Sequence, residues 1–374
     1  MGGSTLGKCF TVTTFGESHG LCIGAVVQGC PPGLTLDVAL IQKALDRRKP
    51  GTSTYTSPRQ ESDSVQIGSG IFQGKTTGTP ILLLIPNEDA KPADYDALQA
   101  VFRPGHGDYT YQQKYGIRDP RGGGRASARE TAARVAAGAI AQHYLHTRFG
   151  IRIRAYVAQI GPVVVQNIDD TFIHQNPLYC PDKTALPLMM QFLQKCQQTG
   201  DSVGAKVVVE AFHVPAGLGE PVFCKLDAEI AKALMSINAA KAVEIGDGFA
   251  VITQQGSQHR DALTSEGFAS NHSGGILAGI STGQTLRAAV AFKPPSSILS
   301  PIETVDKKGQ KVILSVAGRH DPCVGPRAVP VVEAMMACVL LDAVLQMTDL
   351  GLSTNCVGRV VDNLGETPEI PCIT

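Results

Sequence analysis

The sequence predicts a fold of the α+β class, with strands and helices mixed along one chain. Short apolar runs of strand length alternate with longer stretches of helical periodicity, and the two halves of the chain repeat one plan. The expected strands cover residues 81–85, 151–160, 206–212 and 286–292. The expected helices cover residues 36–47, 127–149, 186–198, 227–237 and 328–347.

The internal repeat relates residues 23–45 to residues 203–234. Each segment starts at Gly-Ala with a strand, continues through a proline-containing turn and Gly-Leu, and then enters a helix that ends in Lys-Ala-Leu. Two such halves, about 7–150 and 200–350, pack most simply as pseudo-symmetric layers around one core. The sequence therefore predicts one domain, 1–374, with a pseudo-twofold repeat and an insertion at about 166–200.

Composition excludes several partner classes. Lys plus Arg equals Asp plus Glu, 33 against 33, so no overall charge attracts nucleic acid or an anionic membrane. Aromatic residues make up 5% of the chain, which leaves few stacking surfaces for single strands. The longest apolar run, 329–345, is expected to be too interrupted to span a bilayer, and no signal pattern opens the chain. We expect a cytoplasmic protein without nucleic-acid or membrane partners.

Motif spacing also excludes common cofactor and metal sites. The ten cysteines form no Cys-x-x-Cys pair and no zinc spacing accompanies them, so we expect reduced thiols and no metal. The segment GIFQGKT at 70–76 lacks the Walker spacing and precedes a strand, where a P-loop requires a helix. No Gly-x-Gly-x-x-Gly opens a helix, so a flavin or nicotinamide would not bind on a Rossmann crossover.

The stretch RGGGRASARET at 121–131 indicates an anion site. Ser127 and Glu130 have the spacing of a capping box, which predicts that a helix begins near Ser127. Its N-terminus, flexible glycines and the guanidinium groups of Arg125 and Arg129 suit a phosphate or a carboxylate. A solvated basic turn is the alternative.

Two histidines and one acidic segment are candidates for proton transfer. His19 lies in FGESHG and His106 in FRPGHGD, each followed by glycine and near a carboxylate, and imidazole is suited to protonate a leaving oxyanion near neutral pH. Asp321 lies in GRHDPC. Three roles fit this position: Asp321 is an ion-pair partner of Arg319, or it is the residue at which a helix starts, or it accepts a proton. Arg48 either belongs to the site or complements the dipole of the helix that it ends.

Several long motifs together resemble the chorismate synthases. TTFGESHG, RPGHGDYTYQQKYGIRDPRGGGRASARET and GRHDPC occur in this order in that family. DRRKPGTS, SINAAKAVEIGDGF, SNHSGGILAGISTGQ and KPPSS also resemble family blocks, so the likeness extends over nearly the whole chain.

This resemblance implies a fold, a reaction and a cofactor. The family fold is a sandwich of antiparallel β-sheets and helices, assembled as a homotetramer. The family converts 5-enolpyruvylshikimate 3-phosphate to chorismate by anti-1,4-elimination of phosphate, the last common step of the shikimate pathway to aromatic amino acids. It requires reduced FMN (FMNH2) as a catalyst, because the departing hydrogen sits on an unactivated carbon.

The resemblance also implies roles for individual residues. His106 corresponds to the residue that protonates or orients the reduced flavin, His19 to the acid that assists the leaving phosphate, and Asp321 to the carboxylate beside flavin N5. The implied cofactor residues are Arg125, Ala126, Ser127, Asn238, Ala239, Ala278, Lys293, Pro294, Pro295, Ser296, Ser297 and Arg319. The implied substrate residues are Arg48, Arg103, Arg129 and Arg134.

Three positions depart from the family pattern. Thr54 stands where many members have an arginine implicated with NADPH, Lys49 where arginine is common, and Ala278 where glycine is usual. Thr54 argues against direct binding of NADPH, so we expect NADPH as an indirect reductant, with a separate flavin reductase. Two other functions fit the arginines alone: a flavin-independent transferase or lyase acting on a phosphorylated sugar acid, and a non-catalytic flavin- or phosphate-binding module.

Overall fold

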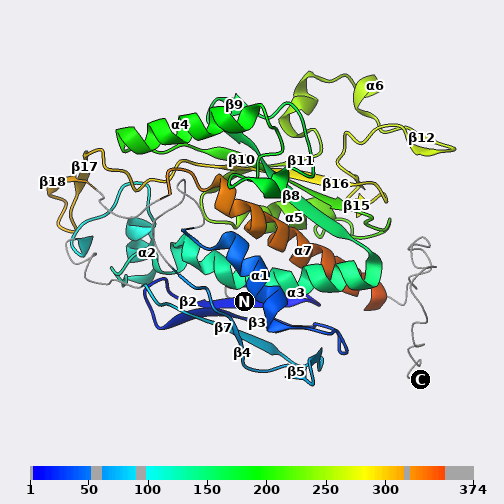
Figure 1. The fold of residues 1–374 in the computed structure, drawn as a ribbon, viewed down its shortest axis with the longest axis horizontal. Coiled ribbons are helices and arrows are strands. Elements are labelled where there is room, and N and C mark those ends of the chain that lie inside the picture. Colours follow the sequence, from blue (N-terminus) through cyan, green and yellow to red (C-terminus); the bar gives the residue numbers. More distant parts are fainter. Residues whose placement is uncertain (1–2, 52–60, 90–97, 316–320, 350–374) are drawn as a thin grey trace.

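The computed structural model describes residues 3–51, 61–89, 98–315 and 321–349, and within them the chain forms two five-stranded antiparallel sheets with helices between them (Figure 1). The first sheet has the order β1-β2-β3-β7-β4 and the second has the order β11-β16-β10-β8-β9. The first comprises β1 (Thr5–Leu6), β2 (Thr11–Gly16), β3 (Cys22–Gln28), β4 (Gln66–Ile67) and β7 (Ile81–Pro86). The second comprises β8 (Arg152–Ile160), β9 (Val163–Val164), β10 (Ala205–Phe212), β11 (Ala240–Ile245) and β16 (Leu286–Phe292).

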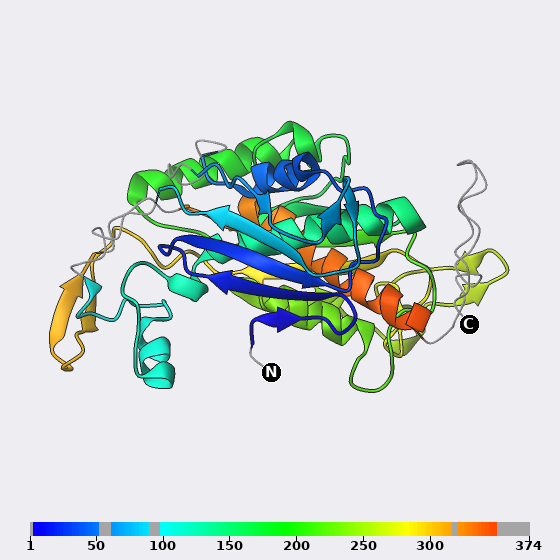
Figure 2. The same ribbon diagram turned by 90° about the horizontal axis from the view of Figure 1, so that it is seen from below.

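The inner face of the first sheet packs on helices. In β7, Ile81, Leu83 and Ile85 are fully buried and alternate with half-buried leucines, the period-two pattern of a strand with one covered face. α1 (Val38–Arg48) and α3 (Thr131–Phe149) lie beside this sheet, and α5 (Leu226–Met235) and α7 (Gly325–Asp349) lie toward the second sheet (Figures 1 and 2). The prediction of a mixed α and β fold is confirmed.

The central contact joins α3 and α7. Both helices are apolar around most of their circumference, as expected for helices buried on several sides. A Cβ added to Gly138 of α3 would lie 2.3 Å from Cβ of Ala334 in α7, so the missing side chain allows the two backbones to approach closely.

The length of α7 corrects one expectation. The apolar segment was expected to be too interrupted for a membrane span, yet Gly325–Thr348 is long and apolar enough by length and composition. In the protein, 94% of its apolar window is buried. The helix therefore packs as the centre of the core in this structure.

The segment between the halves covers the outer face of the second sheet. Ile173, at the start of the 3-10 turn Ile173–Gln175, packs with Tyr156, Val208 and Ala289 in a second apolar cluster. α4 (Ala185–Thr199) follows and lies over β9 (Figure 1). Because both faces of β10 are covered, its sequence is nearly continuous in apolar residues.

Loops and short hairpins complete the chain. The short strand pairs are β5 (Ile71–Phe72) with β6 (Lys75–Thr76), β12 (Leu263–Thr264) with β13 (Gly267–Phe268), β14 (Ile276–Leu277) with β15 (Ile280–Ser281), and β17 (Ile302–Val305) with β18 (Lys311–Leu314). The remaining short helices are α2 (Asp108–Tyr115), α6 (Gly256–His259) and the 3-10 turns Gly124–Ala126, Ala128–Glu130 and Gly248–Thr253.

Candidate active site

A cavity of about 940 Å³ is lined by loops from both halves of the chain. Its walls come from the segments around residues 17–19, 103–129, 238–239, 293–297 and 321–327. This volume is at the upper end of the range of about 300–1,000 Å³ that is typical of ligand pockets, so the cavity has room for more than one small molecule.

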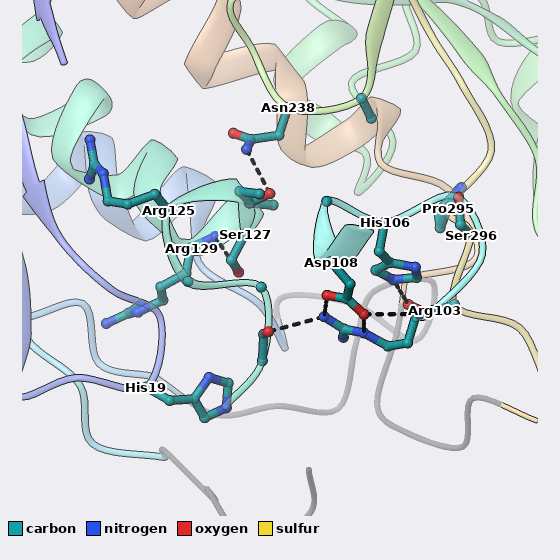
Figure 3. Close-up of a pocket in the computed structure, with 18 of the residues that line it drawn as sticks. His19, Arg103, His106, Asp108, Arg125, Ser127, Arg129, Asn238, Pro295 and Ser296 are labelled. Atoms are coloured by element: carbon teal, nitrogen blue, oxygen red, sulfur yellow. Dashed lines mark hydrogen bonds and ion pairs between the residues drawn. The ribbon is translucent and has the colours of Figure 1, made fainter. Parts of the chain in front are cut away.

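Most of the predicted site residues line this cavity (Figure 3). Among the described residues they are His19, Arg48, Arg103, His106, Arg125, Ala126, Ser127, Arg129, Asn238, Ala239, Lys293, Pro295, Ser296, Ser297 and Asp321. Arg134, Ala278 and Pro294 are not among the lining residues of the described chain. Arg319 and Thr54 lie outside the residues that the structure describes.

For two of the predicted residues that do not line the cavity, Arg134 and Ala278, the structure shows what they do instead. The guanidinium of Arg134 binds the carboxylate of Glu130 at 2.9 Å and the hydroxyl of Ser236 at 2.6 Å, so it ties α3 to the end of α5. Ala278 occupies the turn of the β14–β15 hairpin, with a positive φ of 51°. That hairpin contacts α5 through β15, and Ala278 is not among the residues that line the cavity.

His106 is held by two oxygens. Its Nδ1 lies 2.9 Å from the Pro104 carbonyl, which can only accept, so Nδ1 carries the hydrogen. Its Nε2 lies 2.8 Å from the Ser297 hydroxyl, which can donate to the neutral ring or accept from the charged one. Burial lowers the pKa of His106 below its usual 6.5, and the nearby cations Arg103 and Lys293 act in the same direction.

His19 depends on a glycine of the arginine-rich loop. The imidazole is buried, and its Nδ1 lies 3.1 Å from the Ser18 hydroxyl. Gly122 has a φ of 74°, and a Cβ there would lie 2.5 Å from Nδ1 of His19. Glycine at this position therefore allows the loop to pack against the ring, which brings His19 next to the predicted anion-binding stretch.

The arginine-rich stretch forms turns before it forms a helix. Ser127 caps only the 3-10 turn Ala128–Glu130, by accepting from the Arg129 amide, and α3 begins at Thr131. The reciprocal capping box was a wrong prediction, because the Glu130 carboxylate binds Arg134 and the Thr14 hydroxyl instead. A carboxylate with an arginine partner gains more from that pair than from a backbone amide.

Arg125 keeps its charge uncompensated by carboxylates in the described chain. Its guanidinium donates to the carbonyls of Gly16 and Thr14 at 3.2 and 3.0 Å and to the Thr14 hydroxyl at 2.6 Å. These neutral oxygens position the side chain without cancelling its charge. Arg125 is therefore well suited to attract an anion.

Arg48 and Arg129 are instead paired inside the wall. Asp63 lies between them and accepts from Arg48 at 2.5 Å and from Arg129. Glu61 adds a contact of 3.4 Å to Arg129. Burial alone would raise the pKa of Asp63, but the two guanidinium groups outweigh it and lower that pKa. Much of the charge of these two arginines is thus balanced within the protein.

A third group contains residues that sequence reasoning missed. Asp108 forms a bidentate pair with Arg103, with both distances 2.8 Å, and also binds Arg118 at 2.9 Å. Arg103 further donates to the Gly122 carbonyl at 3.0 Å. Arg118 belongs to the same arginine-rich run as Arg125, which was the available signal. Arg327, which binds Asp321 at 2.6 Å, was also missed.

Asn238, Ala239 and Lys293 form another part of the cavity lining. The amide nitrogen of Asn238 donates to the Ala126 carbonyl at 2.9 Å, while its buried Oδ1 has no hydrogen-bond partner in the described chain. Ala239 has a positive φ of 68°. The Lys293 ammonium donates to the Gly105 carbonyl at 3.1 Å and contacts the Ser296 hydroxyl, and no carboxylate of the described chain pairs with it.

Comparisons with known proteins agree with the sequence motifs. The family model for chorismate synthase matches residues 10–345. A solved structure described as "Crystal Structure of Chorismate Synthase" is 31% identical, with a TM-score of 0.73. The match covers 94% of this chain and 96% of that chain.

Proposed function

The chain belongs to the chorismate synthase family, and we propose that the cavity described above is where it performs that family's reaction. The reaction eliminates phosphate from 5-enolpyruvylshikimate 3-phosphate to give chorismate, so the protein is a lyase acting on phosphate. The main support for this location is one observation. His19, His106, Arg125 and Asp321, which lie far apart in the sequence, line a single cavity.

We propose that reduced FMN binds on the side formed by Arg125–Ser127, Asn238, Ala239 and residues 293–297. The unpartnered Oδ1 of Asn238 is an acceptor that suits a ring N–H, and the carboxylate-free cations Arg125 and Lys293 suit a phosphate. When bound, reduced FMN supplies electron density that helps phosphate to leave and a position that receives the hydrogen. The cavity volume supports room for FMN together with the substrate.

His106 is proposed to hold the proton on the flavin side. Without ligands its lowered pKa keeps the ring neutral at pH 7, with Nδ1–H donated to Pro104 and Nε2 accepting from Ser297. A nearby anion favours the charged imidazole, so anionic ligands would raise the pKa of His106 toward the range of a useful acid. Ser297 then accepts the added Nε2–H and keeps the ring in place.

His19 is proposed to protonate the departing phosphate. The imidazole is fixed by Ser18 and by the close approach of Gly122, next to the loop that carries Arg125. Arg48, Arg103 and Arg129 are proposed to contact the substrate, with their guanidinium groups held in place by ion pairs with Asp63 and Asp108. Asp321 is proposed as the carboxylate beside flavin N5, oriented by Arg327.

We propose a single cytoplasmic domain with an internal pseudo-twofold repeat, assembled as a homotetramer. A separate flavin reductase would supply reduced FMN, with NADPH as its indirect reductant. Light scattering tests the tetramer, and anaerobic titration of the protein and oxidised FMN with NADPH tests whether it reduces flavin alone.

An anaerobic assay tests the proposed function. The protein is mixed with chemically reduced FMN and 5-enolpyruvylshikimate 3-phosphate, and released phosphate and the conjugated diene are followed together. We expect equal amounts of both products, many turnovers per flavin, and no reaction with oxidised FMN. Turnover without any flavin would favour the flavin-independent lyase, and binding of both ligands without turnover would favour a non-catalytic module.

A further inference from the structure

A second cavity lies near the other end of α7. Its volume is about 240 Å³, and its walls combine the loop between β1 and β2, the segment before α5 and the last turns of α7. Its polar lining residues include Lys8, Cys224, Glu220, Glu229 and Asp342, among apolar side chains. None of these residues lines the candidate active site.

Lys8 and Cys224 meet in this cavity although 216 residues separate them. The Lys8 ammonium donates to the Cys224 sulfur at 2.9 Å. Cys224 is a free thiol of intermediate burial, so small solutes can reach it. An amine and a thiol at this separation are close enough for a covalent bond to form with little movement of the backbone.

The backbone around Lys8 is fixed by one carboxylate. Oδ1 of Asp342 accepts from the amides of Lys8, Cys9 and Phe10 at 2.9, 2.7 and 2.9 Å. Gly7 has a φ of 89°, and a Cβ there would lie 2.0 Å from the Phe10 carbonyl, so the tight turn requires glycine. This clamp holds the loop on α7 and keeps the Lys8 side chain over the cavity.

The segment that carries Cys224 is equally well defined. The Glu220 amide donates to the Cys224 carbonyl at 3.2 Å, which closes a turn directly before α5. Gly219 packs so closely on the Gly279 carbonyl that a Cβ would lie 2.3 Å from it. The Lys8–Cys224 contact therefore joins two anchored segments.

We propose that Cys224 and Lys8 are a redox modification site, at which a hydroperoxide oxidises the thiol and the lysine amine then forms a sulfur–nitrogen cross-link. In the first step the sulfur attacks the peroxide, the O–O bond breaks, and the products are a Cys224 sulfenic acid and an alcohol or water. In the second step the neutral Lys8 nitrogen bonds to sulfur, the S–O bond breaks, and the hydroxyl takes one proton from that nitrogen and leaves as water. Sulfur is oxidised by two electrons and the peroxide is reduced by the same two.

The charges around Lys8 and Cys224 determine how the rate of cross-linking should depend on pH. The hydrogen bond with Cys224 is the main cause that raises the pKa of Lys8 above 10.5, and Glu220 and Glu229 raise it further. Lys8 therefore holds its proton while the thiol is reduced. The second step needs the neutral amine, so the Lys8 ammonium first gives a proton to water, and a higher pH increases the fraction of neutral Lys8. The cross-link should form faster as the pH rises.

Mass spectrometry of the full chain after treatment with hydrogen peroxide tests the proposal. We expect a tryptic product that joins the Lys8 peptide to the Cys224 peptide, with the mass of both less two hydrogen atoms. Trypsin should fail to cut after Lys8, and dithiothreitol should restore both peptides. Treated protein should also unfold at a higher temperature, because the link closes a long loop.

Two variants supply matched controls. Lys8→Arg keeps the positive charge but removes the nucleophilic amine, so Cys224 should stop at a sulfenic acid that dimedone traps. Cys224→Ser should lose the product completely. A Cys9–Cys224 disulfide, a cross-link that persists in Lys8→Arg, or a Cys224 that stays reduced while the half-buried Cys22 is oxidised would each overturn the proposal.

Discussion

Ser297 and His106, which are 191 residues apart, share one hydrogen: Oγ of Ser297 lies 2.8 Å from Nε2 of His106. The hydroxyl is the one group in this contact that can change from donor to acceptor when the ring gains a proton. The loop that carries Ser297 reaches His106 because Gly105 lacks a side chain. A Cβ on Gly105 would lie 2.4 Å from the Ser296 hydroxyl.

Replacing His106 tests its role as an acid. His106→Ala should lower kcat by about 10²–10⁴-fold, the usual contribution of a positioned acid or base, while FMN binding is retained. Ser297→Ala should lower kcat less and shift its pH profile, since the ring remains but loses its partner. Normal turnover by His106→Ala would show that another group protonates the flavin side.

The pKa of His106 also predicts a pH-dependent stability. The folded-state pKa lies below 6.5, so as the pH falls below about 6.5 the unfolded chain binds a proton that the native protein does not. The free energy of unfolding therefore decreases as the pH falls through this window. His106→Gln should reduce that loss. Thermal melts of both proteins between about pH 8 and pH 5 check it, and equal slopes would contradict it.

Removing the Arg125 side chain tests the anion site. Arg125→Ala should weaken the binding of FMN or substrate by about 1.5–3 kcal/mol, the value of a hydrogen bond to a charged group. Arg121→Ala is the matched control, because Arg121 is exposed, pairs with Asp119 and does not line the described cavity. Calorimetric titration of both ligands measures the change. Equal affinities for wild type and Arg125→Ala would refute the assignment.

We expect Asp63 to contribute mainly to the stability of the fold and less to catalysis. Asp63→Asn leaves Arg48 and Arg129 without their shared charge, which should cost about 3–5 kcal/mol in the free energy of unfolding. Asparagine tolerates the positive φ of 49°, so strain would not explain the loss. Denaturant unfolding measures it. Because the folded pKa of Asp63 is lowered, the wild-type advantage should be complete above pH 3.8, decline below it, and be lost as the pH falls through the folded pKa.

The close approach of α3 and α7 predicts a sensitive glycine. Gly138→Ala places a methyl group 2.3 Å from Ala334, and overpacking of this kind costs about 1–3 kcal/mol. Gly256→Ala is the control, since nothing lies within 4 Å of the added carbon. Thermal melts should show a lower midpoint for the first variant alone. Unchanged stability of Gly138→Ala would mean that the helices can separate without cost.

Local patterns predicted most of the fold. The helices α1, α4, α5 and α7 and the strands β7, β8, β10 and β16 lie within a few residues of their expected positions, because each has a clear apolar period. α2 was missed because DYTYQQKY has no apolar stripe. The helix α3 begins at Thr131 and not near Ser127, because the Glu130 carboxylate binds the Arg134 side chain and does not complete the predicted capping box.

The sequence predicted most of the residues that line the cavity but not their pairings. Histidines and arginines in loops flanked by glycines can be recognised as candidates from the sequence alone. The carboxylates that neutralise the arginines cannot, because Asp63 reaches Arg129 only through the tertiary fold. For the same reason the sequence does not show that the guanidinium of Arg134, a predicted substrate residue, binds Glu130 and Ser236.

The 25 residues of α7 link the two cavities by a continuous helix, with Arg327 at the first and Asp342 at the second. Each residue of a helix advances the chain by about 100° of rotation. One residue inserted or deleted between these positions would turn one end relative to the other and remove either Arg327 or Asp342 from its place. The spacing between them is therefore fixed by geometry, whereas surface loops can change length.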